Sequence, residues 1–184
     1  GSAEIFGVVH GPQSLKPFAF APREPLLQIT RTQGGFSAQP ELPRPDKVAV
    51  IGARACDLAG LAIQDQIFLS GAYHDNYYAV RREGLFVIAV NCTRALPTCF
   101  CASMDTGPRA KHGFDLALTE VDDQLVVEAG SEAGSDVLSA LSLPPAPQHV
   151  IGEAAARVEA CARNQVRRLD HSRLPQALYD AHEH

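Results

Sequence analysis

With 184 residues, the chain is long enough for one domain with a substantial core and too short for two large ones. Its net charge of −5 excludes a general nucleic-acid binder, because no basic stripe compensates the acidic balance. No apolar run approaches the roughly 18 residues that span a bilayer, so we expect no membrane segment.

The first 47 residues are interrupted by seven prolines and by a Gly-Gly pair. Because proline cannot donate to a strand ladder, this composition favours edge strands and extended loops. We predict an edge strand at Phe6–Val9, a short strand at Leu26–Thr30 and then a loop. Residues 1–47 are thus expected to form a Pro-rich N-terminal segment that packs on the domain.

The pattern of a β-α-β unit follows. Lys47–Gly52 is an apolar run closed by glycine, which is typical of a strand covered on both faces. Helical spacing covers Asp57–Leu69, and Tyr73–Glu83 is predicted as a second helical piece with Asp75 as its N-cap. Leu85–Val90 is another apolar strand. Because helical material separates the two strands, we expect them to be parallel neighbours in one sheet.

A hairpin pattern comes next. Apolar residues alternate over Phe114–Leu118, Asp122-Asp123 supplies a turn, and Leu125–Glu128 returns. Ser135–Leu141 is predicted as a short helix, and a Pro-rich linker follows it. Residues 48–149 are therefore expected to form an α/β core, in which a mixed sheet combines the parallel β-α-β unit, the hairpin and flanking helices.

The C-terminal part is predicted to be helical. Glu153–Leu169 is the clearest amphipathic helix, and residues 170–184 are predicted as a polar tail with a short helix. Residues 150–184 thus form a C-terminal helix and tail. The apolar face of the long helix is expected to consist of Ala155, Val158, Ala162, Val166 and Leu169.

Four of the five cysteines point to a metal centre. Cys56 and Cys92 each follow an apolar strand, and Cys99 and Cys101 come a few residues later. Ligand sites in open α/β sheets gather beyond the carboxyl ends of parallel strands, so these thiols are expected to converge. An odd cysteine count in a chain able to build a core indicates reduced thiols in the cytoplasm rather than a disulfide framework.

The sulfur donors narrow the choice of metal. Four soft thiolates select zinc or an iron–sulfur cluster over magnesium or calcium. Structural zinc sites usually draw on paired Cys-x₂-Cys knuckles, which this chain lacks, so the spacing favours a [4Fe-4S] cluster. A structural zinc site, or buried cysteines with no metal, remains the alternative. Cys161 is expected to be a partly buried structural thiol outside the ligand set.

Nearby cations would stabilise an anionic cluster and raise its reduction potential. Arg54 and Arg94 flank predicted ligands and are the best candidates. Arg81 and Arg82 are candidates for binding the cofactor, unless they face a partner subunit. The simpler interpretation of all four is that they are solvated surface charges.

Several blocks of the chain also carry a resemblance to one known family, among them Gly52-Ala-Arg-Ala-Cys-Asp57, Val90-Asn-Cys92 and Thr98-Cys-Phe-Cys-Ala-Ser-Met104. On these blocks the chain resembles the N-terminal domain of the iron–sulfur (4Fe-4S dicluster) beta subunit of cytoplasmic sulfhydrogenases, a family related to anaerobic sulfite reductase. The likeness runs from about residue 5 to the C-terminus, and Ala55 stands where the family typically has proline. The blocks around Cys56 and at Cys99–Met104 are its most specific parts.

The resemblance implies an electron-transfer domain with no bond-making chemistry, so no catalytic residue is expected. Such a domain relays electrons through a [4Fe-4S] cluster between a flavin-containing NAD(P)H oxidoreductase subunit and a catalytic hydrogenase or reductase subunit. In the family a ferredoxin-like module with two further clusters follows. This chain has no Cys-x₂-Cys-x₂-Cys run, so we expect that module to be missing.

Two other function classes remain open. One is a subunit-docking module in which the cysteines hold a structural zinc ion or nothing. The other is a thiol redox enzyme that uses Cys99 and Cys101, which is disfavoured because the Cys-x-x-Cys motif of such enzymes is absent.

Overall fold

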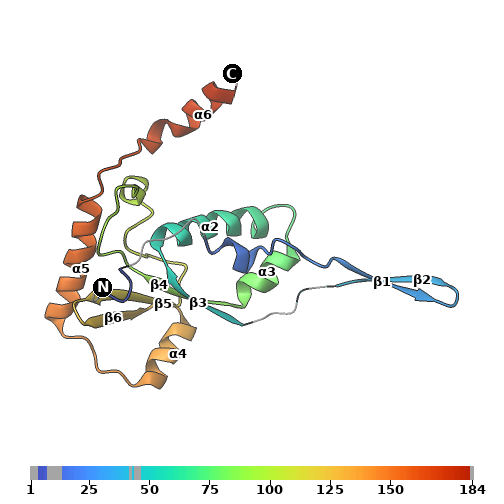
Figure 1. Cartoon of the computed structure of the whole chain (residues 1–184), viewed down its shortest axis with the longest axis horizontal. Coiled ribbons are helices and arrows are strands. Elements are labelled where there is room, and N and C mark those ends of the chain that lie inside the picture. Colours follow the sequence, from blue (N-terminus) through green and yellow to red (C-terminus); the bar gives the residue numbers. More distant parts are fainter. Residues whose placement is uncertain (1–3, 8–13, 42, 44–46, 183–184) are drawn as a thin grey trace.

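A central four-stranded sheet organises the chain in the computed structural model, which describes residues 4–7, 14–41, 43 and 47–182 (Figure 1). The strands lie in the order β3-β4-β5-β6, with parallel pairing between β3 and β4 and between β4 and β5, and antiparallel pairing between β5 and β6. This mixed sheet, with its helices, confirms the predicted α/β class. The strands are β3 (Val48–Ala53), β4 (Leu85–Val90), β5 (Leu116–Val121) and β6 (Gln124–Ala129).

Helices α2 and α3 pack against each other beside this sheet, and α6 extends away from it (Figure 1). Within the described part of the chain, no helix is both long and apolar enough to cross a membrane. The helices are α1 (Lys16–Ala19), α2 (Ala55–Leu69), α3 (Asn76–Glu83), α4 (Glu132–Leu141), α5 (Gln148–Arg163) and α6 (Leu174–His182), with two 3₁₀ turns, η1 (Cys101–Met104) and η2 (His171–Arg173).

The β-α-β unit forms as predicted, and it sets where the chain leaves β3 and β4. Leu58 and Leu61 of α2 are buried against Val87 and Ala89 of β4, in the main hydrophobic cluster. Burial of such side chains contributes about 1.5–3 kcal/mol each, so this face holds the crossover helix on the sheet. The chain therefore leaves β3 and β4 at the same edge of the sheet.

The N-cap residue Asp75 sets the start of helix α3. The Asp75 carboxylate accepts hydrogen bonds from the backbone N–H groups of Tyr77 and Tyr78 at 2.9 and 3.0 Å, as predicted for an N-cap. The helix accordingly starts at Asn76 rather than at Tyr73. The Tyr78 ring is buried, and its hydroxyl donates to Asp65 of α2, which ties the two helices together.

Strand β3 is exposed on one face, contrary to our expectation. We expected Lys47–Gly52 to be covered on both faces, but β3 is the edge strand of its sheet, and the Ile51 side chain is 64% exposed. The apolar composition of the run matches that of a buried strand, and sequence alone does not show which strand ends the sheet. The predicted edge strand Phe6–Val9 is not formed at Phe6, which lies in a bend, and Val8 and Val9 lie outside the described residues.

A second sheet lies away from the core. β1 (Leu27–Thr32) confirms the predicted short strand, but the expected loop after it is in fact β2 (Gly35–Pro40), paired antiparallel with β1. Every residue of both strands is exposed, and the hairpin projects from the domain (Figure 1). Its register places Leu27 and Ile29 opposite Pro40 and Ala38, so one face of the ribbon is apolar.

The C-terminal helix is shifted from its predicted position. It spans Gln148–Arg163 instead of Glu153–Leu169, because Pro147 stands at its N-cap and the chain turns away after Asn164. Its buried face consists of Val150, Ala154, Val158 and Cys161, so Val158 is buried as predicted, whereas Val166 and Leu169 lie beyond the helix and are 76% and 39% exposed. The predicted hairpin of β5 and β6 and the short helix α4 are both present.

Candidate metal centre

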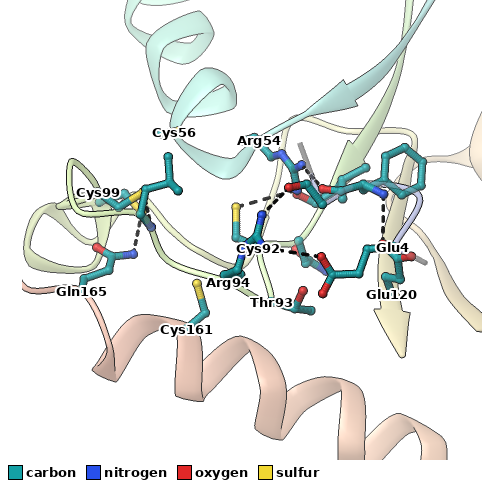
Figure 2. Close-up of a pocket in the computed structure, with 16 residues that line it drawn as sticks. Glu4, Arg54, Cys56, Cys92, Thr93, Arg94, Cys99, Glu120, Cys161 and Gln165 are labelled. Atoms are coloured by element: carbon teal, nitrogen blue, oxygen red, sulfur yellow. Dashed lines mark hydrogen bonds and ion pairs between the residues drawn. The ribbon is translucent and has the colours of Figure 1, made fainter. Parts of the chain in front are cut away.

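The four predicted ligand cysteines line one cavity, of about 120 Å³, at the edge of the sheet where β3 and β4 end (Figure 2). Cys56 is the second residue of α2, directly after β3, and Cys92 is the second residue after β4. Cys99 and Cys101 approach from the loop that follows. All five cysteines of the chain are free thiols in the structure. Within the described ranges, no group of three or more His, Cys, Asp or Glu side chains stands in a geometry that could hold a metal ion.

Asn91 anchors the loop that carries the last two cysteines. Its side chain is 3% exposed, donates to the Thr119 hydroxyl of β5 at 2.9 Å, and accepts from the Ala110 N–H at 2.8 Å. The next residue, Cys92, donates its backbone N–H to the Pro108 carbonyl at 3.2 Å. A buried amide with both of its ends bonded fixes the two ends of the loop to the sheet.

Gly107 allows the loop to close on itself. A Cβ at this position would lie 2.9 Å from the Cys101 sulfur and 3.2 Å from the Ala55 methyl group. Cys101 therefore packs where a larger residue at position 107 would stand, and this contact brings the loop against the start of α2.

Three of the four predicted ligand sulfurs accept an N–H hydrogen bond. The Gln165 side chain donates to Cys101 Sγ at 3.2 Å, and the Leu96 backbone N–H donates to Cys99 Sγ at 3.4 Å. The Arg54 guanidinium donates to Cys92 Sγ at 3.9 Å. N–H donors around the sulfur atoms are the usual surroundings of thiolates that bind metal clusters.

Arg54 is the cation that the structure brings to these sulfurs. Its backbone N–H donates to Asp57 at 2.8 Å in a capping arrangement at the start of α2. Its side chain donates to the carbonyls of Phe6 at 2.8 Å and Val90 at 3.5 Å, so it connects the N-terminal segment to the end of β4. Arg94 also lines the cavity, half-exposed, with Glu4 3.9 Å away.

Burial raises the pKa of two of these thiols, those of Cys56 and Cys92. Desolvation, then Asp57 and the thiols of Cys101 and Cys92, raise the pKa of Cys56 to about 12, although its side chain reaches the solvent. Desolvation also raises the pKa of Cys92, against the opposing effect of the Arg54 charge. A metal must therefore displace protons when it binds. The chemistry of the sulfur donors, though not their present geometry, suits a thiophilic group.

Arg81 and Arg82 lie on α3, outside the cavity lining. Arg81 forms a forked ion pair with Glu24, with N–O distances of 2.8 to 3.1 Å, and Arg82 contacts both carboxylate oxygens of Asp65 at 3.1 Å. In this structure both side chains join elements of the fold. Their predicted role in binding the cofactor stays a prediction.

The sequence did not predict that Cys161 and Gln165 line the cavity. Cys161 projects from α5 into the same cavity and is 1% exposed (Figure 2), whereas the sequence predicted a partly buried thiol outside the set. Its spacing after Ala154 and Val158 continues one helix face, which is a signal that could have placed it on the buried side. Gln165 is 4% exposed, and no pattern in the sequence marks it.

Comparison with known proteins gives one relative. The chain is 32% identical over 123 residues to Sulfhydrogenase 2 subunit beta from Pyrococcus furiosus, across 66% of this chain and 34% of that protein. The chain thus spans about a third of the length of this relative, and the two are related in sequence. No family model and no solved structure matches the chain.

Proposed function

We propose that the chain is an electron-transfer domain of a multi-subunit hydrogenase or sulfur reductase, with one [4Fe-4S] cluster on Cys56, Cys92, Cys99 and Cys101. The observation that carries this proposal is the cavity itself. Four thiols from two strand ends and one loop line it, and three of their sulfurs accept N–H hydrogen bonds. A thiolate-ligated cluster supplies reversible one-electron transfer when it is bound.

The shape of the site supports a cluster over a single ion. A cavity needs only about 10–15 Å³ to hold one water molecule, and this one has about 120 Å³. The ligands also come from separate walls, with Cys56 on the first turn of α2 and Cys99 and Cys101 on the loop around η1. Paired knuckles that would close around one zinc ion are absent from the sequence.

The protein groups at the site favour extra negative charge. The Arg54 guanidinium contacts the sulfur of Cys92, and a nearby cation stabilises the reduced, more negative state of a thiolate cluster. Cys56 sits in the first turn of α2, where the helix dipole also favours a thiolate. Because Cys56 is exposed, it gives electrons a short route between the cavity and a bound partner.

The relative supports the assignment to a complex, since its name makes it one subunit of a sulfhydrogenase. We infer that the partners are a flavin-containing NAD(P)H oxidoreductase subunit and a catalytic hydrogenase or reductase subunit, in the reducing cytoplasm. About two thirds of the relative lies beyond the matched segment.

A second candidate function is a subunit-docking module with a structural zinc ion or no metal. The hairpin of β1 and β2 favours it, because Leu27, Ile29 and Phe36 are 52, 63 and 76% exposed on an isolated ribbon. A lone two-stranded hairpin is at best marginally stable in water, so such a ribbon suits a bound partner. An electron-transfer subunit also needs docking surfaces, so this feature does not exclude the first proposal.

Reversible electron uptake tests the proposal. After anaerobic reconstitution with iron and sulfide, the chain is expected to absorb at about 400 nm, to bleach on taking up about one electron, and to recover on reoxidation. Protein loaded with zinc is the matched control and should show neither change. A reconstituted chain that absorbs at this wavelength but neither bleaches nor recovers would contradict the electron-transfer role.

A further inference from the structure

Gln165 is a buried polar residue, and both hydrogen bonds of its side-chain amide go to the loop that carries Cys99 and Cys101. It lies just beyond the end of α5 and is 4% exposed. Its Nε2 donates to Cys101 Sγ at 3.2 Å (Figure 2), and its Oε1 accepts from the Ala102 N–H at 3.0 Å. Burying an amide costs free energy unless its polar atoms are bonded, and here both ends bond to consecutive residues of one loop.

The backbone sets the orientation of this amide. The Ala102 N–H can only donate, so it must face the carbonyl oxygen of the Gln165 side chain. The amino end then has to face the Cys101 sulfur. The Ala102 N–H therefore fixes the amide so that its N–H group points at the Cys101 sulfur.

Further contacts hold the segment after Gln165 against the same loop. The Leu169 N–H donates to the Ser103 hydroxyl at 3.0 Å, and the His171 ring nitrogen lies 2.9 Å from the Ser103 carbonyl oxygen. The segment from Gln165 to His171 therefore runs along η1 and is bonded to it at several points. The direction of the amide does not depend on the sulfur contact alone.

Gln165 also differs from the other two sulfur donors. The Leu96 donor is a backbone N–H, which substitution does not remove, and the Arg54 donor stands farther from its sulfur, at 3.9 Å. Gln165 is a neutral side-chain donor with the shortest of the three distances. Its substitution removes one N–H···S bond and leaves the formal charge of the site unchanged.

We propose that Gln165 is a positioning residue that holds Cys101 and raises the reduction potential of the centre through its N–H···S hydrogen bond. The donor withdraws electron density from the thiolate and stabilises the added electron. This inference rests on the proposed cluster. It makes Gln165, which is not a predicted ligand, a determinant of the reduction potential of the site.

The test is a redox titration of the reconstituted chain, followed by electron paramagnetic resonance, with iron per chain measured in every sample. Gln165→Met keeps the length of the side chain and removes the donor. At the wild-type midpoint, its ratio of reduced to oxidised centre is expected to fall about tenfold, which is a shift of about 59 mV for one electron. Gln176→Met, at an exposed glutamine of α6, is the matched control and should leave the midpoint unchanged.

Gln165→Leu covers the case in which the methionine variant fails to fold. It also removes the donor and leaves the formal charge unchanged, so its midpoint should fall by about the same amount as that of Gln165→Met. Wild-type protein that binds no iron would refute the cluster itself. Normal iron content with an unchanged midpoint in Gln165→Met or Gln165→Leu would overturn the role of Gln165 and leave the electron-transfer proposal standing.

Discussion

Replacing Cys92 by serine is expected to lower the iron bound after anaerobic reconstitution from about four atoms per chain to less than one. Cys92 is held at the end of β4 by its N–H bond to the Pro108 carbonyl, and its sulfur receives the Arg54 donor. Serine is nearly isosteric, so the loop keeps its anchor, but a hydroxyl is a poor ligand for iron compared with a soft thiolate. Iron analysis and the absorbance at about 400 nm measure the loss.

Cys161→Ser is the matched control, because it changes the same residue type in the same cavity. Cys161 lies in the last turn of α5, where the helix carbonyls disfavour a thiolate, and desolvation raises its pKa to about 12. This variant should keep most of its iron. If Cys161→Ser loses the iron and Cys56→Ser retains it, the fourth ligand belongs to α5 and our ligand set is wrong.

Gly134→Ala is expected to lower the free energy of unfolding by about 3 kcal/mol. Gly134 lies buried in the first turn of α4, and an added Cβ would overlap the Asp115 carbonyl oxygen. That oxygen accepts from the Gly130 N–H at 2.8 Å, and the Asp115 side chain accepts from the Val87 N–H and the Ser131 hydroxyl, each at 2.6 Å. Because the clash is with backbone in this network, α4 has to leave its position on the sheet.

Gly152→Ala gives the opposite result and serves as the control for Gly134→Ala. Gly152 lies inside α5, and nothing stands within 4 Å of its added Cβ. Alanine in a helix interior is favoured over glycine by about 0.5–1 kcal/mol, so this variant should be more stable than wild type. Denaturant unfolding of both variants measures the difference. Equal stabilities would contradict the packing of α4 against Asp115.

The strands that frame the site could be predicted because their signals are local. Leu85–Val90 is apolar throughout and is bounded by Gly84 and Asn91, and β4 has the same bounds. The cap of α3 was equally local, since the Asp75 carboxylate needs only the two N–H groups that follow it. The convergence of Cys56 and Cys92 followed from the parallel pairing of the two strands that precede them.

Features that depend on tertiary contacts were missed. The periodicity of α5 allows more than one apolar face, and packing against Val121 and Val126 selects the face of Val150 and Ala154. That choice also turns Cys161 into the cavity, where the sequence predicted a thiol outside the site. Gln165 has no apolar period and no motif, so its partners in the loop after Cys101 become visible only in the folded chain.

We propose that four thiols of this chain bind an iron–sulfur cluster. The most direct test is the content of iron, acid-labile sulfide and zinc in protein purified without exposure to air. We predict about four iron and about four sulfide per chain, with no zinc. One zinc per chain without iron or sulfide, unchanged in a Cys56→Ala variant, would contradict both the cluster and its ligand set.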